Sequence, residues 1–411
     1  MMWWPAAAFA AMLAGGPAVA QLVQTPQEAL TQDAGEYAGR YGVPIDQAVR
    51  RLQAQEASVA ATDAIAARFV DRLAGIAVEH SPAFRIVVLL TGDAPVPEER
   101  LFVAGIVMPV VYRTGAIATR GEVVAAIERH QQAIRAAVPR APGLGLDQRT
   151  GEMVATLNRA DIGAYGRDAL LTDLTLTTGV PVRLRAVDGP DLDSSVDGGA
   201  RVVGVSPVDG RRYACTTGFV VSDGARAGVV TAAHCPDALA HVDADGLQAP
   251  LTFVDQWGWG YQDVQLHLAA EPLRPFFHAD TAKALVRPVT GTRARRSARA
   301  GDWTCHRGER SGYSCAEVEL TDFAPSGDLC GGACTPTWVT VGGPVCRSGD
   351  SGGPVFVGTT ALGILKGASY DAAGGCNFYY YMSTDFLPEG WTVMRQPVAA
   401  APLTSSGASP R

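Results

Sequence analysis

Apolar residues at helical spacing mark the first part of the chain. Residues 25–42 (TPQEALTQDAGEYAGRYG) and 44–57 (PIDQAVRRLQAQEA) place apolar side chains three or four positions apart, which predicts two amphipathic helices. Thr25 and Pro26 suit the N-cap and the first turn of the first helix. A third amphipathic helix is expected over 121–138 (GEVVAAIERHQQAIRAAV).

Strands are indicated between and after these helices. Residues 84–92 (FRIVVLLTG) and 103–113 (VAGIVMPVVYR) are β-branched runs. A turn at 149–151 in the stretch DQRTGEMVATL leads into an alternating strand. Together, these patterns predict an α+β unit that extends to about residue 187.

The pattern changes near residue 200. Short β-prone runs there alternate with glycine-bearing turns: ARVVGVSPV (200–208), CTTGFVV (215–221), AGVVTAAHC (227–235), PVFVG (354–358), ALGILKG (361–367) and FYYYMST (378–384). Such runs predict a small β-barrel or sandwich. The 46 glycines and the low charged fraction of 18% agree with a turn-rich β body.

Two segments without apolar periodicity flank this β part. Residues 188–199 (DGPDLDSSVDGG) are acidic and almost lack apolar side chains, so we expect an exposed linker that a protease could cut. Residues 398–411 (VAAAPLTSSGASPR) are expected to be disordered. The expected organisation is a signal peptide at 1–20, an α+β region with its linker at 21–195, a β domain at 196–396 and a tail at 397–411.

The first twenty residues predict export. The run MMWWPAAAFAAMLAGGPAVA is apolar and ends in Ala18-Val19-Ala20, which is typical of a secretory signal with an A-x-A cleavage site. No Lys or Arg precedes the run, and a membrane anchor is the alternative. Gly15, Gly16 and Pro17 and the short apolar core argue against a stable span. No later segment is apolar enough to cross a bilayer, so we expect an extracellular protein.

Cysteine usage agrees with export. The first 214 residues contain no cysteine, and eight follow: Cys215, Cys235, Cys305, Cys315, Cys330, Cys334, Cys346 and Cys376. An even number confined to one half predicts a disulfide-linked domain. The spacing of the cysteines does not suggest a zinc site. His80 and His130 are expected at the surface rather than as metal ligands. No metal or cofactor is expected. The net charge of -7 gives no reason to expect nucleic acid as a partner.

One short stretch, CRSGDSGGPVF (346–356), contains a candidate nucleophile. Ser351 lies in the pattern G-x-S-x-G, which alone is also consistent with a glycine turn and a solvated serine. A serine hydroxyl needs a base to take its proton. In α/β-hydrolases, which share this pattern, the histidine follows the serine. All seven histidines precede Ser351 here, so that fold is excluded.

His234 and Asp263 are the candidate base and its orienting carboxylate. His234 ends a β-branched run in GVVTAAHCPD, where small residues would let it lie close to another backbone. A packed histidine beside a disulfide is the alternative. Asp263 opens the alternating stretch DVQLHLA, with Val264, Leu266 and Leu268 on one face. An ordinary turn aspartate is the alternative for that position.

Three motifs in this order, TAAHC, DVQLHL and GDSGGPV, resemble the trypsin-like (chymotrypsin-fold) serine peptidases. The resemblance is to the secreted bacterial streptogrisin and alpha-lytic protease group, and it extends to CTTGFVV, CHRGERSGYSC (305–315) and ALGILKGAS. YAGRYGVPIDQAVRRLQAQEA and DQRTGEMVATL are similar to the pro-regions of that group. The resemblance implies an all-β double β-barrel preceded by an α+β pro-domain.

The resemblance also implies a function. It predicts a secreted serine endopeptidase, made as a monomeric zymogen, that hydrolyses protein or peptide substrates through an acyl-enzyme. Ser351 would be the nucleophile, His234 the general base and Asp263 its orienter, with an oxyanion hole formed by the N–H groups of Gly349 and Ser351. The first half would act as an intramolecular chaperone and inhibitor. A non-catalytic relative that serves as a binding or surface module is the alternative, and an esterase is a third possibility.

Further expectations depend on the same resemblance. It implies the disulfides Cys215–Cys235, Cys305–Cys315 and Cys346–Cys376, with Cys330 and Cys334 left to close a small loop, although eight cysteines allow 105 pairings. It also implies that the carboxylate of Asp350 is buried and has a cationic partner, for which His306 and Arg307 are the candidates.

The resemblance assigns Lys366, Gly367 and Ala368 to the strand that binds the substrate backbone. Three positions are open for the Lys366 side chain. It would lie near Asp263, or it would line the primary pocket and favour an acidic substrate side chain. It would be solvated if the register is shifted by one residue. The cluster RARRSAR (293–299) is interpreted as a solvated loop, with a docking patch as the alternative.

Overall fold

The computed structural model describes most of the chain. The described residues are 22–188, 192–193, 200–208, 210–243, 246–270, 272–343 and 345–396. The expected signal peptide, the expected tail and most of the expected linker lie outside these residues. In the described part of the chain, no helix combines the length and the apolar character needed to cross a membrane.

The chain begins with a short strand and three helices. These are β1 (Leu22–Val23), α1 (Pro26–Tyr41), α2 (Ile45–Ala57) and α3 (Val59–Arg68). Thr25 caps α1 through a capping box with Glu28, and Gly42, at φ 64°, ends it in the left-handed region. The helices predicted over 25–42 and 44–57 are therefore confirmed, while α3 was not predicted.

A four-stranded sheet follows, with the order β2-β3-β5-β4. Its strands are β2 (Leu73–Glu79), β3 (Arg85–Thr91), β4 (Glu99–Val103) and β5 (Ile106–Ala116). Ile65 of α3 packs with Ile76, Val88 and Val110, so α3 covers one face of the sheet. The two predicted β-branched runs correspond to β3 and β5.

A second α+β layer completes the first half. It consists of α4 (Arg120–Ala137), β6 (Gly143–Asp147), β7 (Glu152–Asn158), α5 (Arg159–Tyr165), α6 (Arg167–Thr178) and β8 (Val182–Val187). The sheet order is β23-β6-β7-β8, in which β23 (Thr321–Ala324) comes from the second half of the chain. Strand β23 runs antiparallel to β6. One sheet therefore contains strands from both halves.

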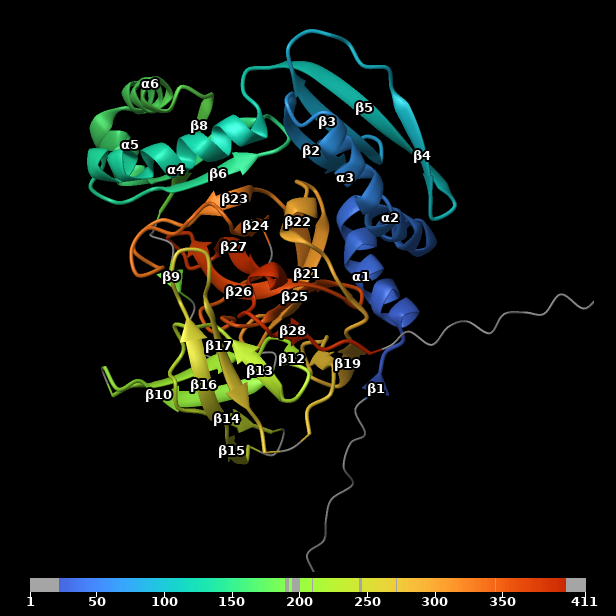
Figure 1. The fold of residues 1–411 in the computed structure, drawn as a ribbon, viewed down its shortest axis with the longest axis vertical. Helices are drawn as coiled ribbons and strands as arrows, with labels where there is room; N and C mark the ends of the chain where they lie inside the picture. The colour runs from blue at the N-terminus through green and yellow to red at the C-terminus, as the bar shows by residue number, and fades with distance from the viewer. Residues whose placement is uncertain are drawn as a thin grey trace, which may run out of the picture.

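Strands from the second half of the chain form two neighbouring sheets. One has the order β11-β10-β14-β15 and the other β16-β17-β13-β12-β28. The strands are β10 (Arg201–Val205), β11 (Arg212–Thr216), β12 (Val220–Ser222), β13 (Ala227–Thr231), β14 (Leu239–Val242), β15 (Gln248–Pro250), β16 (Thr252–Trp257), β17 (Val264–Leu268) and β28 (Thr392–Val393). They lie together at the lower end of the molecule in Figure 1.

Six further strands form a closed barrel. It contains β21 (Trp303–Gly308), β22 (Gly312–Val318), β24 (Val339–Gly342), β25 (Pro354–Val357), β26 (Thr360–Tyr370) and β27 (Cys376–Ser383). The ring closes because β26 pairs with both β25 and β27. The predicted fold class, a largely β second half of chymotrypsin type preceded by an α+β unit, is confirmed.

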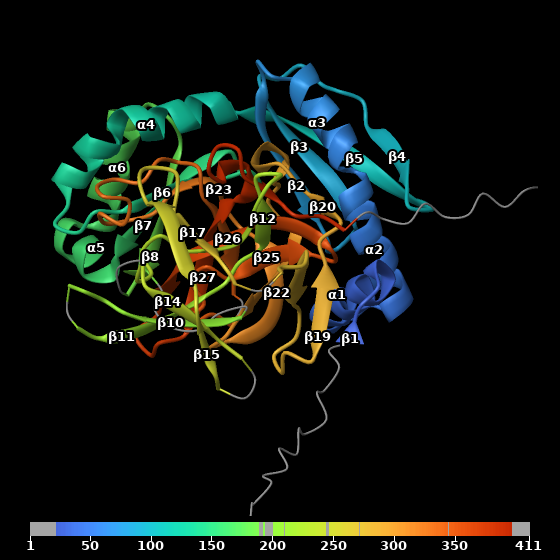
Figure 2. The same ribbon diagram turned by 60° about the horizontal axis from the view of Figure 1, so that its bottom comes forward.

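The first half lies against this closed barrel on two sides. Helices α1–α3 run along one flank, and α4–α6 with β6–β8 cover another, as both views show (Figures 1 and 2). Strand β1 adds in parallel to β19 (Leu285–Pro288), which also pairs with β18 (Phe276–His278). The two halves thus share backbone pairing at β1 as well as at β23.

Two predictions from the sequence are wrong: His80 does not lie at the surface, and residues 293–299 do not form a solvated loop. Both lie where the two halves of the chain meet. His80 is 5% exposed, and its ring contacts Tyr37 Oη at 2.8 Å and the Gly301 carbonyl at 2.6 Å. Residues 293–299 do not form a solvated loop, because Arg293 and Arg299 are buried. Their burial depends on helices that are distant in sequence, which periodicity along one segment does not reveal.

The 293–299 segment contacts α2 and α3 through charges and hydrogen bonds. Arg299 donates to the Ser58 hydroxyl and to the Gln55 carbonyl, both at 2.8 Å, and pairs with Asp302 at 2.9 Å. Arg293 pairs with Glu56 at 2.9 Å. This segment therefore contacts the first half, as the docking alternative would require.

Candidate active site

His234 follows the end of β13. Ala232 and Ala233, both buried, leave room for the chain to turn there, and Cys235 forms a disulfide with Cys215 of β11. The His234 side chain retains 18% of its exposure. The strand end and the disulfide fix the backbone that presents this ring.

Asp263 directly precedes β17, the strand that pairs with β13. The antiparallel register places Gln265 opposite Thr231, which brings the start of one strand near the end of the other. Asp263 is 2% exposed, and its Oδ1 accepts the backbone N–H of His234 at 3.2 Å. Its Oδ2 lies 2.9 Å from Nδ1 of His234. The carboxylate therefore holds both the backbone and the ring of the histidine.

Ser351 completes a hydrogen-bonded chain with these two residues. Its Oγ lies 2.8 Å from Nε2 of His234 and 3.1 Å from the carbonyl of Lys366. With Nδ1–H of His234 donating to Asp263, Nε2 is the acceptor that can receive the serine proton. His234 thus lies within hydrogen-bonding distance of both of the other residues singled out from the sequence, Asp263 and Ser351.

The site keeps Asp263 ionised. Burial alone would raise the pKa of this carboxyl, but its interactions with His234 and Lys366 outweigh burial and lower the pKa well below the usual range. An ionised Asp263 can accept from Nδ1 and stabilise positive charge on the ring. The electrostatics therefore favour the tautomer that proton transfer from Ser351 requires.

Glycines let the Ser351 loop approach β11 and β13. A Cβ on Gly352, at φ 85°, would lie 2.1 Å from the Thr216 carbonyl oxygen. Gly353 has no room either, since a Cβ there would lie 2.7 Å from the Arg307 carbonyl oxygen. The Thr216 N–H donates to the Ser351 carbonyl at 2.7 Å, which fixes the approach. Side chains at 352 and 353 would push the serine away from the histidine.

The backbone of this loop is fixed by a left-handed glycine and by its own hydrogen bonds. Gly349 has φ 120°, a left-handed conformation that favours glycine. The amides of Asp350, Gly352 and Gly353 already donate to carbonyl oxygens, those of Arg347, Leu365 and Asp350 respectively. Gly349 and Ser351, whose amides are expected to form an oxyanion hole, are the neighbours of these residues in the loop.

Asp350 is held by backbone amides, which corrects the expected cationic partner. Its carboxylate accepts the N–H groups of Arg310 and Ser311, both at 3.1 Å, and of Arg347 at 2.8 Å. Arg307 pairs instead with Glu309 at 2.9 Å. Burial raises the pKa of Asp350, while the hydrogen bonds oppose this change. Backbone dipoles replace a cation here, and single-sequence patterns do not reveal such contacts.

His306 does not serve as a cation beside Asp350. Its ring is 0% exposed, packs against Tyr379 with centroids 4.6 Å apart, and places Nε2 3.2 Å from the Ser311 hydroxyl. Burial and the nearby Arg307 lower the pKa of His306 to about 3. The ring is therefore neutral at ordinary pH.

Lys366 lies beside Asp263 and is not solvated. Its side chain is 1% exposed, and Nζ lies 3.4 Å from Oδ2 of Asp263. Nζ also donates to the Leu329 carbonyl at 2.9 Å and lies 5.4 Å from the Trp338 ring centroid. Of the three positions that the sequence left open for Lys366, the structure has the one beside the Asp263 carboxylate.

Gly367 and Ala368 pair with a strand from the end of the first half. In β9 (Leu192–Asp193), Asp193 lies opposite Gly367 and Leu192 opposite Ala368, in antiparallel register. Part of the segment in which the cut is expected thus lies next to the Ser351 site. Sequence analysis treated 188–199 as an exposed linker and missed this pairing, because the stretch has no strand-like alternation.

The three disulfides implied by the resemblance are present, and the two remaining cysteines close the small loop suggested for them. They join Cys215 to Cys235, Cys305 to Cys315, Cys330 to Cys334 and Cys346 to Cys376. Two of them flank the site, one beside His234 and one five residues before Ser351. Four disulfides are typical of a protein that matures in an oxidising compartment.

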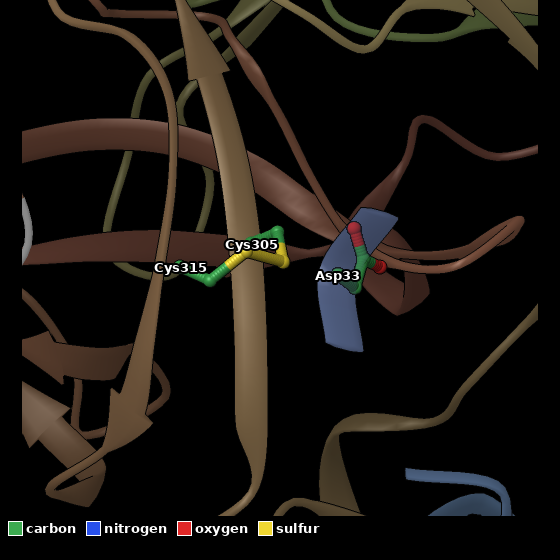
Figure 3. Close-up of side chains that lie close together, drawn as sticks. All are labelled: Asp33, Cys305 and Cys315. Carbon is green, nitrogen blue, oxygen red and sulfur yellow. A yellow bond between two sulfur atoms is a disulfide. The ribbon is translucent and has the colours of Figure 1, made fainter. Parts of the chain in front are cut away.

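One cluster of metal-type ligands proves to be a disulfide. Asp33, Cys305 and Cys315 lie close together, but the two sulfurs are bonded to each other (Figure 3). The Asp33 carboxylate instead pairs with Arg287 at 2.9 Å and accepts from the Tyr313 hydroxyl at 2.6 Å. The thiolates that a metal would need are not available there.

Comparison with known proteins gives structural neighbours only. No family model matches the chain, and no curated protein matches it. Thermobifida fusca Protease A is similar at 20% identity over 49% of this chain and 99% of that chain, with a TM-score of 0.38. A glutamic acid-specific serine protease that uses a histidine triad in substrate binding is similar at 21% over 48% and 99%, with a TM-score of 0.39. Cellulomonas bogoriensis chymotrypsin is similar at 19% over 49% and 98%, with a TM-score of 0.37. At these values the neighbours do not establish an activity for this chain.

Proposed function

We propose that this chain is a secreted serine endopeptidase made as a zymogen. The observation that carries the proposal is the continuous hydrogen-bonded path from Asp263 through His234 to Ser351, with contacts of 2.9 and 2.8 Å. Three side chains from separate loops, aligned in this order, are what acyl transfer by a serine requires. No cofactor takes part in the proposed reaction.

Acylation begins when Ser351 Oγ attacks the carbonyl carbon of the scissile peptide bond. Nε2 of His234 takes the hydroxyl proton as the C–O bond forms, and Asp263 stabilises the resulting imidazolium. The tetrahedral intermediate collapses, the C–N bond breaks, and the imidazolium gives its proton to the leaving amine. A water molecule, activated by the neutral His234, then hydrolyses the ester and regenerates Ser351.

The oxyanion of each tetrahedral intermediate would accept hydrogen bonds from the amides of Gly349 and Ser351. The positive φ of Gly349 supports this assignment. Loss of one such donor raises the barrier by about 3 kcal/mol in a serine protease. The glycines of the loop would thus serve the transition state rather than the resting serine.

The first half would restrain the site until the chain is cut. Strand β9 occupies the edge of β26 at Gly367 and Ala368, where the backbone of a substrate would pair. Ser351 is 0% exposed in the intact chain, which supports an inhibited state. Cleavage within 188–200 would free this edge, and peptide substrates would replace β9. The predicted signal peptide and the four disulfides support export.

Labelling with a fluorophosphonate tests the catalytic proposal. The secreted, processed protein should react at Ser351, whereas Ser351→Ala should not react and His234→Ala should react several orders of magnitude more slowly. Absence of labelling in a processed, correctly folded protein would refute the endopeptidase and favour a binding or surface module. Turnover of an ester without turnover of peptides would favour an esterase.

N-terminal sequencing tests the zymogen proposal separately. The secreted wild-type protein should carry a new N-terminus within 188–201. If Ser351→Ala is secreted uncut, the cut is made by the protein itself. A Ser351→Ala chain cut at the same place would show that another protease performs the step, and a wild type that is active while uncut would contradict the zymogen.

A further inference from the structure

The site contains a buried cation that serine acyl transfer does not require. Lys366 and Lys283 are the only two lysines in the chain. Lys366 lies within the β26 strand, 1% exposed, with its ammonium 3.4 Å from Asp263 Oδ2. Lysine is almost never buried unless it is paired. The partner of the Lys366 ammonium is the carboxylate of Asp263.

The same carboxylate oxygen contacts the lysine and the histidine. Oδ2 of Asp263 lies 2.9 Å from Nδ1 of His234 and 3.4 Å from Nζ of Lys366. Oδ1 accepts the His234 backbone N–H. Asp263 is therefore held from three directions, and its negative charge is shared between two cation-forming groups.

The lysine is itself held in place by a disulfide-closed loop. Nζ donates to the Leu329 carbonyl at 2.9 Å, next to Cys330, which bonds to Cys334. The buried Trp338 ring lies 5.4 Å from Nζ, a distance at which an aromatic face attracts a cation. Two fixed contacts besides Asp263 thus keep the ammonium from swinging away.

The loop is also braced by helix α4 of the first half. Gln131 donates to the Cys334 carbonyl at 2.9 Å, and Arg135 donates to the Gly327 carbonyl at 2.6 Å. These contacts lie on either side of the residue that receives the lysine. The ammonium is consequently supported from β26, from the loop and, through the loop, from α4.

We propose that Lys366 is a positioning residue that holds Asp263 and offsets its charge, so that His234 remains a neutral base at lower pH than it would beside an unpaired aspartate. This inference rests on the proposed function. A nearby cation opposes the formation of an imidazolium on Nε2, because it weakens the negative potential that the carboxylate creates at the ring. Lys366 is therefore expected to extend the activity of the site toward acid.

Few other groups compete with this interaction. Among the residues that the structure describes, the charged or titratable groups that act on the Asp263 carboxyl are His234, from the loop after β13, and Lys366, from β26. Strand β27 supplies the Met382 thioether, 3.3 Å from the Asp263 amide. Tyr380 of the same strand lies against Trp338, and Asp328 of the loop is directed to Arg135. Loss of Lys366 should thus remove the cation next to the carboxylate, together with the contacts to the Leu329 carbonyl and the Trp338 ring.

The pH dependence of the fluorophosphonate labelling rate of the processed protein tests the proposal. In Lys366→Met the acidic limb of the profile should move to higher pH by on the order of one unit. Lys366→Ser should show the same displacement, and its hydroxyl should recover part of any plateau rate that Met loses through poorer positioning. Lys283→Met is the matched control and should keep the wild-type profile. An acidic limb that stays in place in folded Lys366→Met would overturn the proposal.

A second measurement does not depend on catalysis. Labelling lysine with ¹⁵N gives two side-chain ammonium signals, and Lys283→Met identifies the one from Lys366. The Lys366 signal should shift strongly in Asp263→Asn and should not respond to Glu309→Gln, which removes the partner of Lys283. A Lys366 signal unchanged by Asp263→Asn would overturn the pairing even if the protein is active. A shifted signal in a protein that no fluorophosphonate labels would refute the proposed function and leave the pairing supported.

Discussion

The loop that carries Ser351 is in tight contact with strands β11 and β13. Gly352 lies against the Thr216 carbonyl and the Thr231 hydroxyl, at distances where no Cβ fits. Its φ of 85° adds a second requirement for glycine. The serine reaches the histidine because two backbone segments meet at this residue.

Gly352→Ala should therefore be far more damaging than an alanine at another left-handed glycine. We expect it to destabilise the fold by roughly 3 kcal/mol or more, since strain and a backbone clash combine. Gly374→Ala is the matched control, because Gly374 has φ 82° with open space around it, and it should cost about 1 kcal/mol. Urea unfolding of both variants in a Ser351→Ala background measures the difference, and equal losses would contradict the clash.

At the scale of elements, α1 is attached to the β half of the chain by buried charge. Asp33 and Arg287, both 0% exposed, pair at 2.9 Å. Asp33 also accepts the Gly358 N–H at 2.6 Å and the Tyr313 hydroxyl at 2.6 Å. Further along, Gln55 of α2 exchanges hydrogen bonds with the backbone of Trp303. These helices contact the barrel through specific polar groups as well as through apolar area.

Asp33→Asn should destabilise the full chain by about 3 to 5 kcal/mol, because it leaves the Arg287 charge buried without a counterion. Asp33→Asn combined with Arg287→Met should recover much of the loss. Glu36→Gln, an exposed position on the same helix, should have no measurable effect. Unfolding midpoints in urea distinguish these cases, and a double variant as unstable as Asp33→Asn would contradict the charge argument.

Sequence analysis succeeded for elements whose signal is local and failed where distant segments meet. The capping box at Thr25, the helix over 121–138 and the order of the His234, Asp263 and Ser351 motifs depend on neighbouring residues in the chain. The burial of Arg299 depends on Ser58 and Gln55, more than two hundred residues away. The amide cage of Asp350 likewise depends on a backbone conformation that residue types do not encode visibly.

At the scale of the whole molecule, buried histidines link stability to pH. Burial lowers the pKa of His80, and it lowers the pKa of His267 and His278 to about 4 and of His306 to about 3. A histidine whose pKa is lowered on folding stabilises the fold above its unfolded pKa of about 6.5, and this contribution is lost as the pH falls toward the folded value.

Stability should consequently decline from about pH 6.5 toward pH 4, each buried histidine adding up to about 1.4 kcal/mol per pH unit. The raised pKa values of Asp33 and Asp350 act in the opposite direction close to pH 4. Urea unfolding of Ser351→Ala between pH 8 and 4 measures the slope. His80→Gln should reduce it and the half-exposed His130→Gln should not; a slope of zero would contradict the expectation.

The halves should remain associated after a single cut between residues 188 and 200. Strand pairing at β1 and β23, the Asp33–Arg287 pair and the contacts of Arg299 all cross between them. The two fragments of the cut protein should elute together in size-exclusion chromatography and separate in denaturant. Separate elution in native buffer would show that these contacts do not outlast the covalent link.

Strand β23 sets a condition on any later loss of the first half. Thr321–Ala324 pairs with β6, and the Phe323 ring packs against Gly143 and Gly145. Without that half, the strand would present unsatisfied amides and carbonyls at an open sheet edge, and the side of the Phe323 ring that covers the two glycines would be uncovered. Such an edge recruits strands from other molecules. The freed β domain would then tend to aggregate. Its solubility therefore depends on how quickly β23 is covered by another segment.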